Sequence, residues 1–424
     1  MQATETAAQP RALEGLLVLD FGRVLAAPHA AQFMADLGAD VVKIERPKHG
    51  DDTRFDPHIY EPGLSGAFMQ QNWGKKSLSI DLRHDAAKPV IEALIRAADV
   101  LIENFRPGVM ERMGFGWDSV HAINPRLVMC SVSAYGQTGP YAQRPGYGPL
   151  AEAIAAIPDM GGASDGPPMP TVLPIADNMA AAMAFGAICA ALLYRHRSGE
   201  GQYVDISLLD AAFQMHDIAT QRYLASDGQE EMRRRGLRDV TWVPWGFFEG
   251  ADGWVCIMCG NESIWPPLAR AMGREDMVED PRFDTFEHRY ENRDEVYRII
   301  EEWVAGFGSI NEIVELLSEA GVPTAPVNSI GQAVRDPQIR ARNMLLEFDH
   351  PQLGAIEVVN SGLRFSATAS DVHGLPPYLG EHNRDVVVDI AGIPEQEYQR
   401  LVELGVLYRD DRADRYGDSA HGRS

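Results

Sequence analysis

One carboxylate stands out because its surroundings suit either a structural or a chemical role. Asp177 lies in the segment VLPIADNMAAAM, after a loop rich in Gly and Pro and directly before an Ala-rich stretch that predicts a helix. An Asp at the start of a helix commonly accepts backbone N–H groups as a cap. The same positive helix end keeps a carboxylate ionised, and an ionised carboxylate can attack an acyl carbon. Asp177 is therefore either a cap or a nucleophile.

Basic and polar residues follow several predicted strands of the chain. In open parallel sheets, ligands bind outside the carboxyl ends of the strands. Arg side chains at such ends suit phosphate, and an aromatic ring there could lie against an adenine or a pantetheine arm. Each residue alone could be simple surface charge, but together they predict an anion-binding crevice. They are Arg46, Arg83, Asn104, Phe105, Arg106 and, in the following turn, Arg112.

The elements that must position these residues predict a doubly wound α/β fold. Leu16–Asp20 and Asp40–Glu45 are apolar runs of strand length, and a helical stretch from Pro28 to Leu37 separates them. Strand, helix and strand in about 30 residues form a βαβ unit, which implies parallel strands with right-handed crossovers. Further strands are predicted over Ser77–Leu82, Val100–Glu103 and Leu127–Val132, with helices over Ala86–Ala98 and Ala180–Tyr194. The last of these is short for a bilayer and predicts a buried helix.

The character of the sequence changes after Ser226–Arg238, a charged stretch with few apolar residues. Val243–Glu249 and Trp254–Cys259 then flank the turn sequence GADG and predict a hairpin. Short helices are predicted from Ser263, Asn292 and Ile310. The middle of the chain is therefore expected to be a separate α+β unit.

Composition narrows the class of protein. A chain of 424 residues is too long for one ordinary core, so two domains are expected. Lys and Arg number 38 against 61 Asp and Glu, and the net charge of −23 argues against a nucleic-acid partner. Four cysteines cannot form a disulfide framework, and the N-terminal MQATETAAQP lacks an apolar signal region. We expect a cytoplasmic protein with no membrane partner.

Several common catalytic motifs are absent from the sequence. The first strand exits into DFGRVLAAPH rather than a G-x-G-x-x-G loop, and there is no Walker A, H-E-x-x-H or G-x-S-x-G motif. Cys256 and Cys259 have the spacing of a redox or zinc pair, but they lie in a predicted strand, where residues three apart face opposite sides. The histidines show no ligand spacing. We therefore expect structural thiols and no metal site.

Ordered segments along most of the chain resemble the class III CoA-transferases, the family that includes formyl-CoA transferase, carnitine CoA-transferase and α-methylacyl-CoA racemase. The resemblance runs from about Leu13 to Ile390. No segment alone is specific for this family, but the occurrence of all of them in this order is. The segments are LVLDFGRVLAAPHAAQFMADLGADVVKIERP, NWGKKSLSIDLR, ADVLIENFRPGVMERMGF, NPRLVMCSVSAYGQTGP, SGEGQYVDISLLDA and LGEH.

The resemblance implies a Rossmann-like large domain built from both ends of the chain, a small central domain, and an interlocked homodimer of two threaded rings. On this basis we expect the small α+β domain over residues 226–328 and a linker over residues 329–344. The large CoA-binding domain is then expected over residues 13–225 and 345–408. Disorder is expected for residues 1–12 and for the tail over residues 409–424, which has no apolar face.

The resemblance also implies a reaction in which Asp177 is the nucleophile. The carboxylate attacks a donor acyl-CoA to give an aspartyl–acyl anhydride, the CoA thiolate returns to give an aspartyl-CoA thioester, and an acceptor acid leaves as acyl-CoA. Coenzyme A enters as substrate, so no ATP, metal or permanently bound cofactor is expected. The CoA contacts carried over by segment are Leu25, Ala26, Arg46, Ile80, Asp81, Leu82, Arg83, Asn104, Phe105, Arg106, Arg112 and Tyr147.

Three departures from the family pattern bear on specificity. Tyr147 stands where racemase members place a His, and a phenol with an ordinary pKa of ~10 is a poor base at neutral pH. Formyl-CoA transferase has a run of glycines where this chain has CGNES with only Gly260, which argues against specificity for oxalate. Leu25 stands where that enzyme has a Gln near the nucleophile, so the acceptor is expected to be larger or less polar than oxalate. Two alternatives remain: an acyl-CoA racemase or epimerase, and a non-catalytic acyl-CoA-binding protein in which Asp177 only caps.

Overall fold

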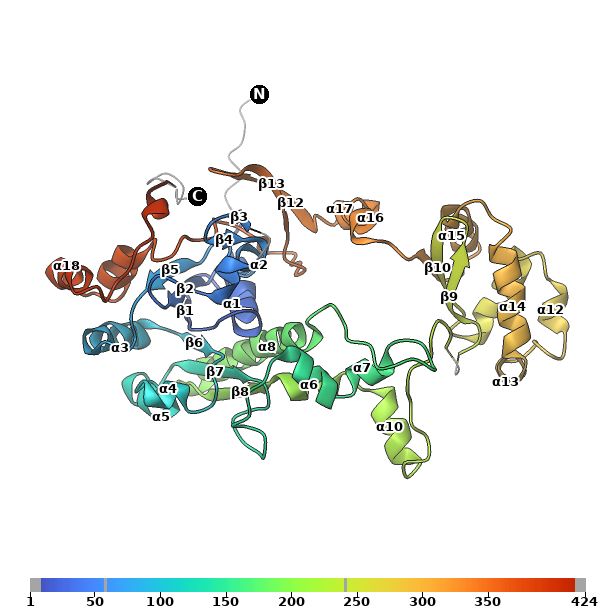
Figure 1. Cartoon of the computed structure of the whole chain (residues 1–424), viewed down its shortest axis with the longest axis horizontal. Helices are drawn as coiled ribbons and strands as arrows, with labels where there is room; N and C mark the ends of the chain where they lie inside the picture. The colour runs from blue at the N-terminus through green and yellow to red at the C-terminus, as the bar shows by residue number, and fades with distance from the viewer. Residues whose placement is uncertain (1–8, 57–58, 240–241, 416–424) are drawn as a thin grey trace. The chain divides into compact units, whose positions relative to one another are not determined.

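The structure is a computed structural model that describes residues 9–56, 59–239 and 242–415 (Figure 1). The described chain forms two compact units. The large unit contains the residues up to Ala155, Val172–Asp217 and those from Arg340 onward, and the small unit contains Ala156–Thr171 and Ile218–Ile339.

These boundaries differ from those expected from the sequence. Both expected limits of the small domain, 225/226 and 328/329, lie inside the small unit of the structure. The segment 156–171 also belongs to the small unit, because Asp159 pairs with Arg234 and the amide of Gly236 donates to the carbonyl of Gly162 at 3.0 Å. The composition of Ser226–Arg238 suggested a domain boundary there, but composition carries no information about these tertiary contacts.

A six-stranded parallel sheet forms the centre of the large unit, as the apolar runs predicted. Val18 in the central strand lies opposite Val41 on one side and Val100 on the other. The order β5-β2-β1-β6-β7-β8 reverses direction between β1 and β6, which is where ligands of such sheets bind. The strands are β1 (Leu17–Asp20), β2 (Asp40–Glu45), β5 (Lys76–Ser79), β6 (Val100–Glu103), β7 (Val128–Ser133) and β8 (Tyr203–Ser207).

Helices cover both faces of this sheet (Figure 1), which explains why most residues of its strands are buried. On one face α1 and α8 pack against each other, with α6 and α9 beside α8. On the other face α3 and α5 pack on a core that Val386 and Leu401, close to the C-terminus, complete. These helices are α1 (Ala26–Asp36), α3 (Lys88–Ala97), α4 (Val109–Arg112), α5 (Trp117–Ile123), α6 (Gly148–Ile154), α8 (Ile175–Ser198), α9 (Leu208–Gln214) and α18 (Glu395–Glu403).

A second core of the large unit joins segments from both ends of the chain. Trp73 and Tyr378 are each 1% exposed within it. Around them lie two hairpins and a short helix, which are β3 (Ile59–Glu61), β4 (Leu64–Ser65), α2 (Gly66–Gln70), β12 (Leu345–His350) and β13 (Gly354–Val359). The expected linker contains α16 (Ile330–Ala333), which belongs to the small unit, and α17 (Pro337–Ala341), which spans the boundary between the units.

Parts of both expected disordered ends are ordered. Ala413 is buried in this second core, so residues 409–415 do not belong to a disordered tail. Arg11 donates a hydrogen bond to the carbonyl of Asp36 at 2.6 Å, which fixes residues 9–12. One buried Ala in a polar sequence is too weak a pattern to predict packing. The rest of the two expected segments, residues 1–8 and 416–424, lies outside the described residues.

The small unit is the expected α+β fold. The predicted hairpin is β9 (Trp245–Gly250) paired with β10 (Gly253–Met258), and β11 (Thr324–Pro326) adds a third strand. Helices begin close to the three predicted starts. The helices of the unit are α7 (Ile157–Met160), α10 (Ile218–Ala225), α11 (Trp265–Ala271), α12 (Asp276–Glu279), α13 (Phe286–Glu291), α14 (Arg293–Val304) and α15 (Ile310–Glu319).

The Ala-rich helix α8 is longer and more exposed than predicted. It begins at Ile175, so Asp177 lies within its first turn rather than before it. The face that contains Ala180 and Ala184 is buried, whereas Leu193 is 61% exposed, so the helix is not wholly buried within the chain. Among the described residues it is the one helix with the length and apolar composition of a membrane span, and 33% of that window is buried.

Candidate active site

Two adjoining cavities open at the carboxyl ends of the central strands. The larger has a volume of about 610 Å³ and the smaller about 130 Å³. The larger lies within the ~300–1,000 Å³ typical of ligand pockets. Arg23 and Phe105 line both cavities, and the Arg23 guanidinium lies 5.5 Å from the centre of the Phe105 ring. An elongated ligand can therefore extend from one cavity into the other.

The larger cavity brings together part of the expected CoA contact set. Arg46, at the end of β2, and Ile80–Arg83, after β5, both line it. These segments are far apart in the sequence but adjacent in the sheet, because β2 pairs with β5 in parallel register. Phe105 adds an aromatic ring at the end shared with the smaller cavity.

Basic side chains at the rim of the larger cavity are exposed and weakly held. Arg46 pairs with Asp52, and Arg83, which is 89% exposed, donates two hydrogen bonds to Asp81 at 3.0 and 3.2 Å. Lys48 makes no ion pair with any residue that the structure describes. Exposed ion pairs are worth about 0–1 kcal/mol, so an incoming polyanion can exchange them at low cost. The rim suits phosphate groups.

The smaller cavity contains the candidate nucleophile. Tyr147 lies at its mouth with 72% of its surface exposed, so its phenol is not enclosed as a catalytic base would be. Arg112 lines neither cavity; it ends α4 on the exposed side of the turn. The expected site residues that do line the smaller cavity are Leu25, Ala26, Asn104, Phe105, Arg106, Tyr147 and Asp177.

The carboxylate of Asp177 is held closely by its surroundings but is not used as a helix cap. No side chain caps the start of α8, and the Asp177 carboxylate accepts a hydrogen bond only from its own backbone N–H among the described groups. Gly148 packs directly against the carboxylate, and any larger residue there would clash, because a Cβ built at that position would lie 2.0 Å from Asp177 Oδ2. Burial and the nearby charge of Glu152 raise the pKa of Asp177 from 3.8 to about 6. The group is still mostly ionised at neutral pH.

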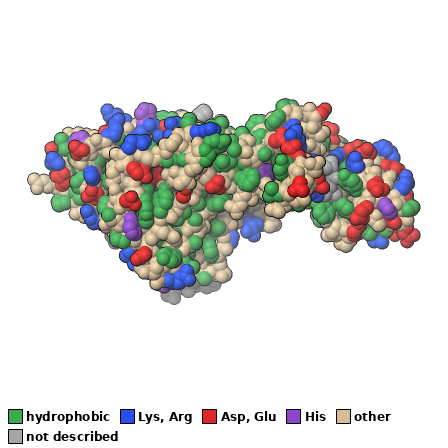
Figure 2. Space-filling view, turned by 90° about the horizontal axis from the view of Figure 1, so that it is seen from below, with side chains coloured by type: hydrophobic (Ala, Val, Ile, Leu, Met, Phe, Trp, Pro, Cys, Tyr) green, Lys and Arg blue, Asp and Glu red, His purple; other side chains and the backbone are tan. Residues whose placement is uncertain are grey.

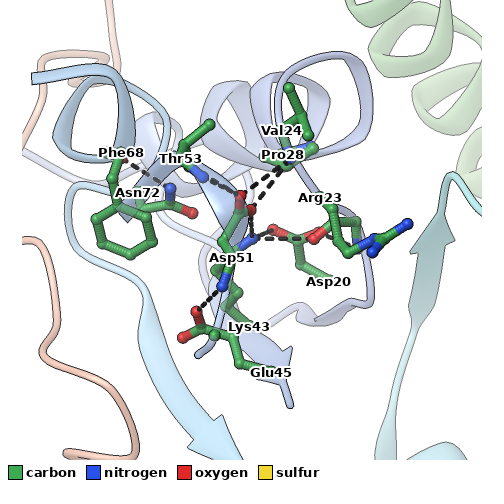
Figure 3. Close-up of polar contacts among 12 residues, drawn as sticks. Asp20, Arg23, Val24, Pro28, Lys43, Glu45, Asp51, Thr53, Phe68 and Asn72 are labelled. Carbon is green, nitrogen blue, oxygen red and sulfur yellow. Dashed lines mark hydrogen bonds and ion pairs between the residues drawn. The ribbon is translucent and has the colours of Figure 1, made fainter. Parts of the chain in front are cut away.

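A cluster of buried charges lies beneath the loop that joins β1 to α1 (Figure 3). Lys75 Nζ donates to Asp20 at 2.8 Å, and Lys43 Nζ lies 3.0 Å from Asp51. Burial acts to lower the pKa of Lys43, but the charges of Asp51 and Asp20 outweigh it, and the pKa is raised. Burial lowers the pKa of Lys75 to about 8, because Asp20 compensates only in part.

This charged cluster holds the backbone of the loop (Figure 3). Gly22 donates its amide to Asp20 at 2.8 Å, and its carbonyl accepts from Lys43 at 3.0 Å. The amide of Val24 donates to both oxygens of Asp51 at 3.2 Å. The loop therefore has little freedom, although it lies at the mouth of a cavity.

The loop also stores backbone strain next to the site. Val24 has a φ of +67°, a left-handed conformation that is unfavourable for a β-branched residue. Arg23 is fixed on the opposite side, since its amide donates to Asn104 Oδ1 at 2.8 Å and its carbonyl accepts from Asn104 Nδ2 at 2.7 Å. Together these bonds set the direction in which Arg23 and Leu25 enter the smaller cavity.

Sequence reasoning missed several residues that line the cavities. Arg23 and Lys48 each lie three residues after the end of a strand, so the strand-end argument could have found them. Arg144 lines the smaller cavity and stacks on the Tyr141 ring at 3.7 Å. It belongs to a long loop after β7, and no sequence pattern places it near Asp177.

The thiols show no sign of a joint site. The four cysteines are free, and Cys259 is buried beside β10, which contains Cys256. Burial raises the pKa of both thiols, that of Cys259 to about 12. Within the described residues, no group of three or more His, Cys, Asp or Glu side chains is arranged to hold a metal ion.

Comparison with known proteins agrees with this geometry. The family model described as CoA-transferase family III matches residues 13–383. The chain is 35% identical over 401 residues to the succinyl-CoA–D-citramalate CoA-transferase of Chloroflexus aurantiacus, which covers 94% of this chain and 98% of the relative. It is 31% identical to the succinyl-CoA:glutarate CoA-transferase of Mus musculus, over 93% of this chain and 90% of the relative.

A solved structure agrees at the level of the fold. A CAIB/BAIF family protein from Brucella suis superposes with a TM-score of 0.80 at 32% identity, over 90% of this chain and 100% of that one. The matched family span contains both cavities except Gly405. The chain therefore belongs to CoA-transferase family III and is an enzyme of that family.

Proposed function

We propose that this enzyme moves CoA from a short acyl-CoA, of the succinyl-CoA type, to a dicarboxylic acid through covalent intermediates on Asp177. The observation that carries the proposal is the position of that carboxylate. It is ionisable and free of any capping bond, and it lines a small cavity that adjoins a cavity large enough for a nucleotide. Among the described groups it accepts a hydrogen bond only from its own backbone N–H, so it still has lone pairs that can attack an acyl carbon.

The reaction proceeds by exchange of one activated acyl bond for another. Asp177 Oδ attacks the thioester carbon, the C–S bond breaks, and the products are an anhydride and CoA thiolate. The thiolate attacks the aspartyl carbonyl of the anhydride, which releases the donor acid and leaves an aspartyl-CoA thioester. The acceptor carboxylate then attacks the aspartyl-CoA thioester, which releases CoA thiolate and forms a second anhydride. The thiolate attacks the acceptor carbonyl of this anhydride, which gives the new acyl-CoA and frees Asp177. The narrow cavity of about 130 Å³ favours this chemistry because it limits the water that would hydrolyse an anhydride.

Support for a dicarboxylic acceptor comes from the relatives and from the wall of the smaller cavity. The two CoA-transferases compared above are named for succinyl-CoA with citramalate and with glutarate. Citramalate and glutarate each carry two carboxylates, and succinyl-CoA carries one free carboxylate beside its thioester. Arg23, Arg106 and Arg144 line the cavity and can pair with a second carboxylate. Leu25 makes the same wall less polar than a Gln would, which favours an acid longer than oxalate.

A transfer assay over a panel of acids tests this function. The enzyme is incubated with succinyl-CoA and with oxalate, malate, glutarate, citramalate or acetate, and the new acyl-CoA is measured by chromatography. Digestion and mass spectrometry then locate an acyl or CoA adduct on the peptide that contains Asp177. We expect transfer to malate, glutarate or citramalate in preference to oxalate and acetate, an adduct on Asp177, and no transfer by Asp177→Asn.

A matched control separates chemistry from folding in that assay. Asp118 lies in the first turn of α5 as Asp177 does in α8, but it is exposed. Asp118→Asn should keep full activity. Transfer by Asp177→Asn, or deuterium uptake at the α-carbon of an acyl-CoA without any acceptor acid, would contradict the proposal; binding of CoA without turnover on the whole panel would do the same.

We also propose that the chain functions as a homodimer. The large unit exposes many large apolar side chains, and Figure 2 shows hydrophobic side chains between the charged groups. Patches of this kind mark interfaces in soluble proteins. The exposed residues near α6, α8 and α9 include Leu150, Ile154, Val172, Leu173, Leu193, Tyr194, Phe213 and Met215. Native mass spectrometry should give twice the mass of the chain, and a monomer at micromolar concentration would contradict the proposal.

The free cysteines bear on the cellular compartment of the protein. We propose a reducing cytoplasm, because Cys130 and Cys259 are buried as free thiols and the chain holds no disulfide among the described residues. A membrane partner is not proposed, since α8 packs its Ala face on α1 and carries Asp177. Cell fractionation should place the protein with the soluble fraction.

A further inference from the structure

Helix α6 places two residues close to Asp177, Gly148 and Glu152, and only the first is explained by the need for space. Gly148 leaves room for the Asp177 carboxylate. One helical turn further on, the Glu152 carboxylate is buried, with 3% of the residue exposed. A buried carboxylate beside a nucleophilic carboxylate is costly, because the two charges repel each other in a poorly solvated site. Such an arrangement calls for a functional reason.

We propose that Glu152 is a positioning residue that fixes the first turn of α8 and makes the neutral, acylated form of Asp177 more favourable relative to its free anion. This inference rests on the proposed function, since it takes Asp177 to be the residue that is acylated. It adds a residue from outside the cavity wall, as Glu152 lines neither cavity.

The geometric part of the argument is a single hydrogen bond at the start of α8. The amide of Ala176 donates to Glu152 Oε1 at 3.1 Å in a buried position. The first amides of a helix have no partner within the helix, so this bond satisfies one of them from another element. Asp177 is the next residue along the chain. The Asp177 carboxylate accepts only its own backbone N–H among the described groups, which leaves lone pairs on its oxygens available for attack, while Glu152 takes the role of the cap at Ala176.

The electrostatic part depends on which charges surround that turn. Burial and then the charge of Glu152 raise the pKa of Asp177. Burial lowers the pKa of His29 on α1, which bonds Asn178 at 3.1 Å, so His29 brings no positive charge at neutral pH. The other ionisable groups on the elements packed against this turn, or on the cavity wall, are Arg23, Asp36, Asp52, Arg106, Arg144, Tyr147, Tyr203, Asp205, Asp210 and Cys130.

The consequence for the reaction follows from the charge of each state of Asp177. The free carboxylate is negative and is repelled by Glu152. The anhydride and the CoA thioester of Asp177 are neutral at the aspartyl carbonyl, so acylation removes the repulsion. Glu152 therefore favours every covalent intermediate over the resting enzyme, and it makes the free carboxylate more basic and so a stronger nucleophile.

Two substitutions separate the bond from the charge. Glu152→Gln keeps an oxygen that can accept from Ala176 but removes the charge, and Glu152→Ala removes both. The first readout is the pH dependence of kcat/KM for CoA transfer, whose acidic limb reports ionisation of the free enzyme. The second is the fraction of Asp177 found acylated by mass spectrometry at a fixed ratio of acyl-CoA to free acid.

We expect Glu152→Gln to move the acidic limb about one pH unit lower and to lower the acylated-to-free ratio of Asp177 about tenfold. Glu152→Ala should do the same and also lower kcat, because the first turn of α8 loses its partner. Glu14→Gln, an exposed control, should change neither readout. If Glu152→Gln leaves both the limb and the acylated fraction unchanged, the inference is wrong. Transfer by Asp177→Asn would instead overturn the proposed function itself, so the two failures are distinguishable.

Discussion

Asp177→Asn should stabilise the large unit while it removes the proposed nucleophile. Burial and the neighbouring Glu152 raise the pKa of Asp177 from 3.8 to about 6, which means that the folded protein disfavours the charged carboxylate. At 1.36 kcal/mol per pKa unit, a shift of about two units corresponds to ~3 kcal/mol. Favourable interaction of the anion with the start of α8 offsets ~0.5 kcal/mol of this cost. The neutral amide should therefore add about 1–3 kcal/mol to the free energy of unfolding at neutral pH.

The pH dependence of this gain has a definite sign. Below pH 3.8 the Asp is protonated in both the folded and the unfolded chain, so the wild type bears no charge cost. Between 3.8 and about 6 the unfolded chain ionises first, and the stability of the wild type falls as the pH rises. Above about 6 the cost is complete. The advantage of Asp177→Asn should therefore be small at pH 4 and largest above pH 6.5.

Hydrogen exchange of peptides from α8 in increasing urea measures this advantage for the large unit alone. The free energy of opening is compared between wild type and Asp177→Asn at pH 4, 5, 6 and 7.5, with intrinsic exchange rates corrected for pH. Asp118→Asn is the control, because Asp118 is exposed and also lies in the first turn of its helix. Equal or lower stability of Asp177→Asn at pH 7.5 would refute the reasoning, and so would a gain that does not vary with pH.

Three further predictions follow from the packing around the cavities. Gly148→Ala should lower kcat by at least ~100-fold because the new Cβ displaces the Asp177 carboxylate, whereas Gly186→Ala, where nothing lies within 4 Å, should keep normal turnover in the same transfer assay. Arg46→Ala should raise the KM for acyl-CoA about tenfold at unchanged kcat, and an equal loss in kcat would assign Arg46 to the chemical step. Arg54→Met should cost about 3–5 kcal/mol in urea unfolding, because it leaves the carboxylate of a buried ion pair without its partner, and a neutral result would contradict the burial of that pair.

The parallel sheet could be predicted because its strands are buried on both faces. Apolar runs such as Leu17–Asp20 and Val100–Glu103 are readable in the sequence, and helices between them require parallel pairing. The carboxyl ends of these strands then carry polar residues to one edge. That reasoning located Arg46 and Asn104 without any knowledge of their contacts.

The buried charges could not be predicted by the same reasoning. Lys43 lies in the middle of β2 and is 0% exposed, although an alternating pattern would place a Lys on a solvated face. Its burial depends on Asp20 and Asp51, which come from other segments and meet it only in the folded chain. Local patterns carry no information about such pairings, so the support beneath the β1–α1 loop was missed.

The residues of helix α6 near Asp177 could not be predicted from the sequence either. Gly148 and Glu152 look ordinary in the sequence, where they are a residue next to a proline and a helical Glu. Their importance comes from packing of α6 against α8, which brings both to one side of Asp177. A contact between two helices determines which residues surround the nucleophile, and no spacing along one helix reveals it.

The burial that destabilises Asp177 is also what makes it useful. A solvated carboxylate would be a weaker base and would leave an anhydride open to water. Enclosure in a cavity of about 130 Å³, beside Glu152 and against Gly148, raises the free energy of the anion but not that of a neutral anhydride or thioester. In the proposed reaction the resting state is thereby moved closer in free energy to the covalent intermediates. The loss of stability at position 177 and the gain in reactivity there have the same physical cause. A substitution of the surrounding residues that restores the stability should therefore also reduce the reactivity.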